Sequence, residues 1–376
     1  MAGEPPRVGV TLANRNGRRL ELTAGEVTGA LGDSVTVLPL VVALGALTPL
    51  SVPRILLWFG VFQIVWGVGY GLPLSVEPMK ALAGLAIAGV LGVPELLAAG
   101  LLSGGALLLG GRLGLLARLQ RVVSDPLVRG IQLAVALVLA RAAVDLLAVD
   151  PLLAGVGAAA VALVALTGRP QAGALVVLGI GGALAVAETG VPAPSPPSLA
   201  LFPDGLPALS ADVASGTLAQ LATSVGNAAV ATSLLCADLF DADVSADELA
   251  GSMGAMTLVA VPLGGLPMCH GSGGLAGKHA FGARTGGANL VLGALYLAGA
   301  LVAGVVTAIP TALLGVVLVV VAVHLGRTAI DSADRPLTVG VGVLALLSSI
   351  GVAFVLGAVV DRLLARLPAE HPLRSR

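Results

Sequence analysis

Long apolar runs, separated by short polar or proline-rich breaks, fill the chain from about residue 25 to residue 364. Several runs exceed 18 residues, the length at which a helix can cross a membrane. Most of them leave no polar face, so they cannot all be helices on the surface of a soluble protein. The alternating segments of about 10 residues that mark a transmembrane β-barrel do not occur. The pattern predicts an all-α polytopic membrane protein.

Composition agrees with this prediction. The chain has 376 residues, of which 57% are hydrophobic and 11% charged, whereas soluble domains carry about 25% charged residues. The net charge of −1 gives no reason to expect a nucleic-acid partner. Cys236 and Cys269 lack metal-ligand spacing and suggest no disulfide framework. We therefore expect a lipid bilayer as the surroundings, no cofactor and no metal, and we leave a homodimer open.

Two broken stretches repeat each other along the chain. GLPLSVEPMK runs from Gly71 to Lys80, and GLPMCHGSGG runs from Gly265 to Gly274, so the two lie 265 − 71 = 194 residues apart. Gly32-Asp33 and Gly226-Asn227 repeat the same offset. Each stretch interrupts an apolar run and then restarts as a short apolar segment. A matched pair of broken membrane segments points to a transporter substrate site between two repeats.

The prolines predict how the first stretch folds. Pro73 and Pro78 cannot both lie inside one regular helix, so we expect extended backbone between them. Pro78 suits the first position of a short helix that runs from Met79 to about Val90. The second stretch predicts a matching short helix that ends at about Ala280.

The expected organisation is two inverted membrane repeats of seven segments each. An odd number of segments gives the repeats opposite orientations in the membrane. The arginine-rich loops then share one side with both termini, which the positive-inside rule makes cytoplasmic in the cell membrane. The predicted parts are a cytoplasmic tail (1–20), repeat one (21–189), a Pro-rich extracytoplasmic linker (190–207), repeat two (208–367) and a cytoplasmic tail (368–376).

Four motifs resemble those of a known family. PMCHGSGGLAGKHAFGARTG (267–286) resembles the signature of the molybdate transporter family related to the SulP sulfate permeases. GALGDSVTVLPL (29–40), LPLSVEPMKALAG (72–84) and DPLVRGIQLAVAL (125–137) are similar to its first-half motifs. The resemblance implies an oxyanion permease with the seven-plus-seven inverted-repeat fold of uracil permease. It also implies a core domain that carries the site, a gate domain and no STAS domain.

Helix N-termini are natural anion sites, because their free N–H groups and dipole favour negative charge. Two opposed half-helix N-termini, near Pro78 and Ser272, would form a cradle for an oxyanion. The only two lysines of the chain, Lys80 and Lys278, occupy the two short helices. Helical side chains lean toward the N-terminus, so both ammonium groups can reach the cradle. The expected substrate contacts are Ser75, Lys80, His270, Gly271, Ser272, Gly273, Gly274 and Lys278.

Each of these assignments has a structural alternative. A buried lysine is costly in a bilayer, so each lysine can instead pair with a neighbour such as Glu77. Glu77 and Asp33 are candidates for proton coupling, or they are ion-pair and packing partners. His270 is either a ligand or a hydrogen-bonding fixture of the turn. Ser34, Gly226 and Asn227 accompany these candidates as first-span residues and repeat mates. The sequence assigns no role to Arg284, Gln63, Gln132 and Arg129.

We therefore expect a secondary active transporter of a tetrahedral oxyanion, molybdate or sulfate, coupled to H⁺. One alternative keeps the fold but carries a nucleobase or bicarbonate, and another is an anion channel. An enzyme is disfavoured, because the chain has no HExxH or GxSxG motif.

Overall fold

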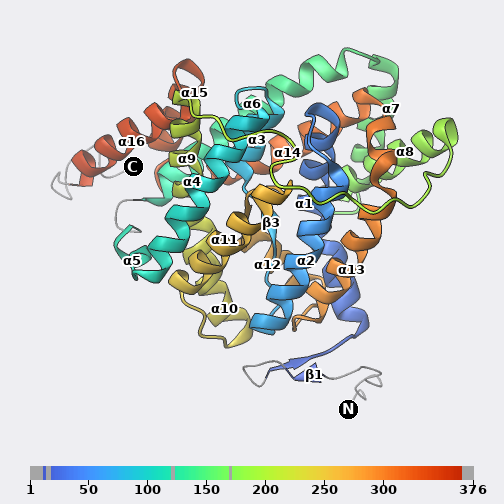
Figure 1. The fold of residues 1–376 in the computed structure, drawn as a ribbon. Helices are drawn as coiled ribbons and strands as arrows, with labels where there is room; N and C mark the ends of the chain where they lie inside the picture. Colours follow the sequence, from blue (N-terminus) through green and yellow to red (C-terminus); the bar gives the residue numbers. More distant parts are fainter. Residues whose placement is uncertain (1–11, 14–17, 120–122, 169–171, 366–376) are drawn as a thin grey trace.

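The computed structural model describes residues 12–13, 18–119, 123–168 and 172–365, and most of these are helical (Figure 1). The N-terminal part begins with a two-stranded hairpin, β1 (Leu12–Ala13) and β2 (Arg19–Leu20). The first half then contains α1 (Ala24–Leu47), α2 (Val52–Tyr70), β3 (Glu77–Pro78), α3 (Lys80–Ile87), α4 (Val93–Arg112), α5 (Leu116–Leu119), α6 (Asp125–Leu147), α7 (Pro151–Ala165) and α8 (Ala172–Thr189).

The second half repeats this order of long helices around one short one. It contains α9 (Ala211–Thr223), the π-helix η1 (Ser224–Ala231), α10 (Thr232–Phe240), α11 (Ala246–Ala260), the 3₁₀ turn η2 (Val261–Leu263), β4 (Met268–Cys269), α12 (Ser272–Ala280), α13 (Gly287–Val302), the 3₁₀ turn η3 (Ala303–Ala308), α14 (Thr311–Ile330), α15 (Arg335–Leu347) and α16 (Ile350–Ala365). The break between α15 and α16 confirms the one predicted near Ser348-Ser349.

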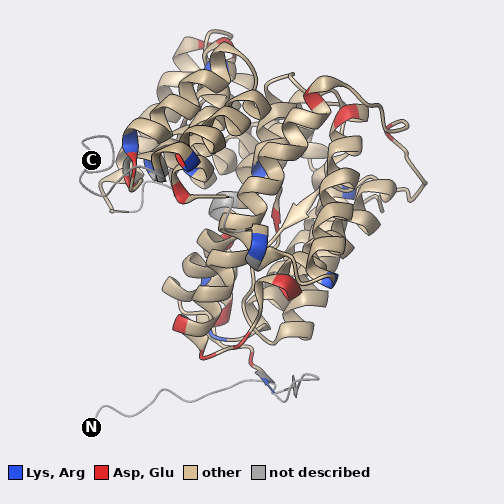
Figure 2. Ribbon diagram, turned by 90° about the vertical axis from the view of Figure 1, so that its left-hand side faces the viewer, with Lys and Arg blue, Asp and Glu red and all other residues tan. Residues whose placement is uncertain are grey.

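The helices have the length and polarity of membrane spans. Within the described residues, six are long and apolar enough to cross a bilayer, and α1 is a seventh if its two bent parts count as one span. Pro39 lies inside α1 and removes the backbone hydrogen bond to residue 35, which accounts for the bend just before it. Long stretches of the ribbon carry no charged residue (Figure 2). The polytopic helical class is therefore confirmed.

The packing shows the inverted repeat directly. Seven segments of the first half (α1, α2, β3 with α3, α4, α6, α7, α8) match seven of the second (α9 to α10, α11, β4 with α12, α13, α14, α15, α16). Helix α2 packs on α13 as α11 packs on α4, and α12 packs on α1 as α3 packs on α9. Helix α15 packs on α6 as α7 packs on α14. Each contact thus recurs with the two halves exchanged.

The two broken stretches pair with each other at the centre of the molecule. Strands β3 and β4 are antiparallel, with Glu77 opposite Cys269 and Pro78 opposite Met268. The separation of Glu77 and Cys269 (269 − 77 = 192) equals that of the two helix starts, Lys80 and Ser272 (272 − 80 = 192). A residue paired with its own repeat mate lies on the local two-fold axis. The structural offset is therefore 192, two residues less than the GLP motifs indicate.

This pairing also corrects the predicted start of the first short helix. Pro78 lies in the strand and not at the first helical position. The backbone N–H of Met79 donates to the carbonyl of Pro267 at 2.9 Å, so the extended pairing continues through Met79 and the helix begins at Lys80. The helix ends at Ile87, three residues before the predicted Val90.

The helices form two groups. Helices α1 to α4 pack with α9 to α13, and α6 to α8 pack with α14 to α16. The groups meet where α3 and η1 contact α6, where α1 contacts α8 and α14, and where α9 contacts α16. A Cβ at Gly226 of η1 would lie only 2.8 Å from Val128 of α6, so this glycine permits the close approach. The division matches the expected core and gate domains.

Two predicted boundaries need comment. The linker extends from residue 190 to residue 210, because α9 begins only at Ala211. It is tied to the bundle by an ion pair between Arg54 and Asp204 and by a bond from Ser195 N to Leu301 O at 2.9 Å. The expected N-terminal tail includes the β1–β2 hairpin, and the expected C-terminal tail lies outside the described residues.

Candidate functional site

Two half-helices, α3 and α12, begin next to each other at the β3–β4 pair. Neither N-cap residue, Met79 or Gly271, makes a side-chain cap. The first N–H groups of such helices therefore need partners from elsewhere in the protein or from a ligand. Together with the helix dipoles, these groups give the centre of the molecule a positive potential.

A small pocket opens at this point, between the two helix groups. Its volume is about 30 Å³, which is room for very few water-sized molecules. The half-helices, α9 and η1 line one side, and α6 and α14 of the second group line the other. The polar lining residues are Glu77, Lys80, Gln132, Gln220, Thr223, Asn227 and His270.

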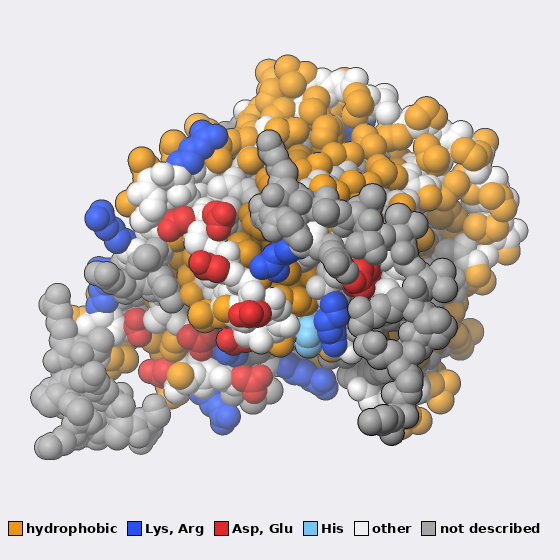
Figure 3. All heavy atoms as spheres, turned by 90° about the horizontal axis from the view of Figure 1, so that it is seen from below, with side chains coloured by type: hydrophobic (Ala, Val, Ile, Leu, Met, Phe, Trp, Pro, Cys, Tyr) orange, Lys and Arg blue, Asp and Glu red, His pale blue; other side chains and the backbone are white. Residues whose placement is uncertain are grey.

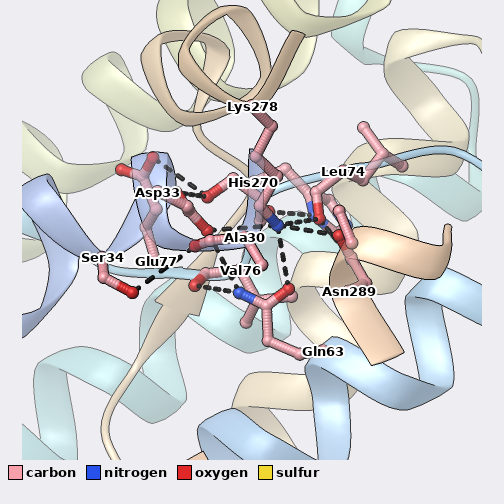
Figure 4. A network of polar contacts seen from close by, with 12 residues as sticks. Ala30, Asp33, Ser34, Gln63, Leu74, Val76, Glu77, His270, Lys278 and Asn289 are labelled. Atoms are coloured by element: carbon pink, nitrogen blue, oxygen red, sulfur yellow. Dashed lines mark hydrogen bonds and ion pairs between the residues drawn. The ribbon is translucent and has the colours of Figure 1, made fainter. Parts of the chain in front are cut away.

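An unbroken chain of charged and polar groups runs from the pocket into the core. Lys80 Nζ lies 2.5 Å from Glu77 Oε2. The hydroxyl of Ser75 lies 3.2 Å from Glu77 Oε1 and 2.6 Å from Asp33 Oδ1. Lys278 Nζ lies 3.1 Å from Asp33 Oδ2 at the other end of the chain. Figure 4 shows Asp33, Glu77 and Lys278 converging from three elements.

The structure separates the two lysines that the sequence treats alike. Lys80 lines the pocket, and 26% of its side chain is exposed. Lys278 is fully buried, pairs with Asp33 and does not line the pocket. The local pairing of Lys80 with Glu77, three residues before it, was the structural alternative, and it is present.

Two glycines of the second stretch make room for the carboxylates. A Cβ at Gly271 would overlap the carboxylate of Glu77, and a Cβ at Gly274 would overlap Glu77, Ser75 and Asp33. Gly273 is exposed, and a Cβ there would meet nothing within 4 Å. Close backbone approach is thus required at Gly271 and Gly274 but not at Gly273.

Side chains of α9 and η1 occupy both helix N-termini. Gln220 Oε1 accepts hydrogen bonds from the backbone N–H groups of Ala81 (3.1 Å) and Leu82 (3.4 Å), at the start of α3. Asn227 Oδ1 accepts from the hydroxyl of Ser272, the first residue of α12, at 2.6 Å. Asn227 lies within the π-helix η1, a distortion that is frequent at functional sites.

The sequence prediction included Asn227 but missed Gln220 and Thr223. A local signal existed, because Gln220, Thr223 and Asn227 form a polar stripe at helical spacing in an otherwise apolar span. Gln132, which had no assigned role, also lines the pocket.

His270 lies at the pocket wall and is held on both sides. Its Nδ1 lies 3.0 Å from the carbonyl oxygen of Ser75, and its Nε2 lies 2.8 Å from the hydroxyl of Ser252. A carbonyl only accepts, so Nδ1 carries the proton. The rings of Trp66 and Tyr70 meet it edge-on. These contacts correspond to the fixture interpretation and leave no ring nitrogen unused.

The remaining candidates lie away from the pocket. Gln63 Nε2 donates to Asp33 Oδ2 and to the carbonyl of Val76, both at 3.3 Å. Arg129 pairs with Asp125 at 2.6 Å, at the start of α6.

Two further residues also make contacts outside the pocket. Arg284 is exposed and donates to the carbonyl of His279 at 2.7 Å. Ser34 is buried, and its hydroxyl lies 3.5 Å from the carbonyl of Ala30.

The chain is similar to known transporters in sequence and in fold. A family model described as "Molybdate transporter of MFS superfamily" matches residues 25–139 and 212–325. Molybdate transporter 1 of Arabidopsis thaliana is 31% identical over 366 residues, which cover 81% of this chain and 80% of that protein.

Solved structures show the same fold. The transmembrane domain of the cyanobacterium bicarbonate transporter BicA superposes with a TM-score of 0.64 at 18% identity, over 95% of this chain and 99% of that one. The murine anion transporter Slc26a9 in the inward-facing state gives a TM-score of 0.63 at 13% identity, over 91% of this chain and 68% of that one. The predicted seven-plus-seven inverted-repeat fold is confirmed.

Proposed function

Because this chain belongs to the molybdate transporter family, we propose that it carries a tetrahedral oxyanion, molybdate and also sulfate, across the cell membrane by secondary active transport. It is a multi-pass anion transporter and not an enzyme. The observation that carries the proposal is a pocket at the core–gate boundary where Lys80 meets the N-termini of two half-helices.

The anion sits between the two half-helices and is held by one lysine. The ammonium group of Lys80, the N–H groups at the starts of α3 and α12, and the hydroxyl of Ser272 supply donors and positive potential. Gln220 and Asn227 occupy donors of the two N-termini without the anion, so they move aside when it binds. Lys278 acts indirectly: it neutralises Asp33, so that Lys80 opposes the only carboxylate at the pocket.

Glu77 carries the coupled proton. The two lysines and the two carboxylates of the buried chain cancel in charge, so a bound dianion adds uncompensated negative charge. A proton on Glu77 removes the nearest negative charge and frees Lys80 for the anion. Asp33 is the weaker candidate, because Lys278 holds it outside the pocket lining.

Access to the pocket changes when the two helix groups slide past each other. The pocket is lined from both groups, with Gln132 on α6 and Leu325 on α14 facing the half-helices. We assign the face seen in Figure 3 to the cytoplasm. Charged side chains gather there, and exposed Arg118 and Arg284 lie in two of the loops that the positive-inside rule makes cytoplasmic.

Uptake of labelled molybdate into proteoliposomes tests the proposal. We expect saturable uptake that an inward proton gradient accelerates, that sulfate inhibits and that uracil leaves unchanged. Lys80→Met should abolish uptake, whereas Arg112→Met, at the exposed end of α4, should not. Non-saturating flux at channel-like rates, or full activity of Lys80→Met, would refute it.

A further inference from the structure

The ammonium group of Lys278 lies in a cage of oxygen atoms behind the anion pocket. Its Nζ lies 2.7 Å from Asn289 Oδ1, 3.1 Å from Asp33 Oδ2 and 3.2 Å from Gln63 Oε1. The carbonyl oxygen of Leu74 is the fourth neighbour, at 3.3 Å. The lysine side chain, the carboxylate and both amides are fully buried. The cage is therefore closed to solvent and made of oxygen ligands only (Figure 4).

The protein fixes these oxygens independently of the lysine. Gln63 Nε2 donates to Asp33 Oδ2 and to the carbonyl of Val76, which turns Gln63 Oε1 toward Nζ. Asn289 Nδ2 donates to the carbonyl of Leu74 at 2.5 Å, which turns Asn289 Oδ1 the same way. Helices α1, α2 and α13 and the extended segment before β3 each supply one oxygen. The donor set thus persists as a preformed site around whatever cation fills it.

The chemistry of this set suits a metal cation as well as an ammonium group. One carboxylate, two amide oxygens and one backbone carbonyl are the ligand types that hard cations take in proteins. An ammonium group has three hydrogens, and four oxygens surround Lys278 Nζ, so two of them must share a hydrogen. A spherical cation has no such restriction. The cage carries one negative charge, which matches a monovalent ion.

We propose that Lys278 is a tethered counter-ion that fills a monovalent cation site of this transporter. The wild-type protein therefore needs neither Na⁺ nor K⁺ at this position, and the cage takes up Na⁺ when the lysine is shortened. A fixed cation keeps Asp33 neutralised at every stage of transport, which a dissociable ion cannot do. The inference concerns the cage alone and does not depend on which anion is carried.

Thermal unfolding of the purified protein tests the cage without any transport measurement. Midpoints are compared in sodium, potassium and N-methyl-D-glucamine gluconate at one ionic strength. We expect the wild type to unfold at the same temperature in all three. Lys278→Ala should unfold several degrees lower in N-methyl-D-glucamine and should recover saturably as Na⁺ is added. Asp33→Asn/Lys278→Ala should show no recovery, because the carboxylate ligand is gone.

Lys80→Ala is the matched control for ion-specific recovery. It also removes a lysine beside a carboxylate in a half-helix, but Lys80 is partly exposed and not enclosed by oxygens. Its midpoint should not depend on Na⁺. If Lys278→Ala cannot be purified, Lys278→Ser replaces it. Equal midpoints of the alanine or serine variant in Na⁺ and N-methyl-D-glucamine would overturn the proposal, as would a wild type that is stabilised by Na⁺.

Discussion

Replacement of Glu77 by Gln separates proton coupling from anion binding. The side chain is fully buried, lies 2.5 Å from Lys80 Nζ and lines the pocket. An anion held by Lys80 therefore lies within a few ångströms of this carboxylate. Two unit charges about 5 Å apart repel by about 3 kcal/mol at an effective dielectric constant of about 20. That energy corresponds to roughly a hundredfold in affinity, and more for a dianion.

The wild type should bind the anion together with one proton. Its dissociation constant for molybdate should then fall as the pH falls, by about one decade per pH unit while Glu77 is ionised in the free protein. Glu77→Gln imitates the protonated state at every pH. The variant should bind molybdate with the tight, low-pH affinity of the wild type, and this affinity should not vary with pH. Net accumulation driven by a proton gradient should be lost.

Isothermal titration of the purified protein with molybdate at several pH values measures both effects. Glu95→Gln is the matched control, because Glu95 caps α4 at its own N-terminus and does not line the pocket. It should keep the wild-type affinity and pH slope. A Glu77→Gln protein that keeps the wild-type slope, or that binds molybdate more weakly at neutral pH, would refute the assignment of the proton to Glu77.

Three further predictions concern the pocket and its supports. Lys80→Met should weaken molybdate binding by about 10-fold to 100-fold in the same titration, because a charge-assisted hydrogen bond is worth about 1.5–3 kcal/mol; unchanged affinity would exclude Lys80 as a ligand. Gly274→Ala should lower stability by about 1–3 kcal/mol through overlap with three side chains, and it should lower the unfolding temperature. Gly273→Ala, in open space, should leave that temperature unchanged. Glu26→Gln should destabilise the start of α13 by about 1–3 kcal/mol, because the buried carboxylate accepts bonds from three backbone N–H groups there, and faster amide exchange at Ala288 would report it.

Local patterns in the sequence were sufficient for the fold class. Hydropathy predicted the spans, and the repeated GLP stretches predicted two breaks followed by short helices. These features depend on a few consecutive residues, since a proline or a run of apolar side chains constrains the backbone wherever it occurs. The start of α3 was predicted two residues too early, because pairing with a strand 191 residues away (Cys269 opposite Glu77, Met268 opposite Pro78) decides where the extended backbone ends.

The sequence by itself determined that two lysines lie in two half-helices of a repeated, broken-helix membrane protein. Only the tertiary structure decided that these lysines differ. Lys80 finds its carboxylate three residues away and stays at the pocket, whereas Lys278 meets Asp33, 245 residues earlier in the chain. Gln220 likewise reaches the N-terminus of α3 from the other half of the protein. Side-chain polarity is local information, but the partner of a buried charge is set by the packing of distant helices, because a charge in a bilayer must be paired with whatever that packing brings beside it.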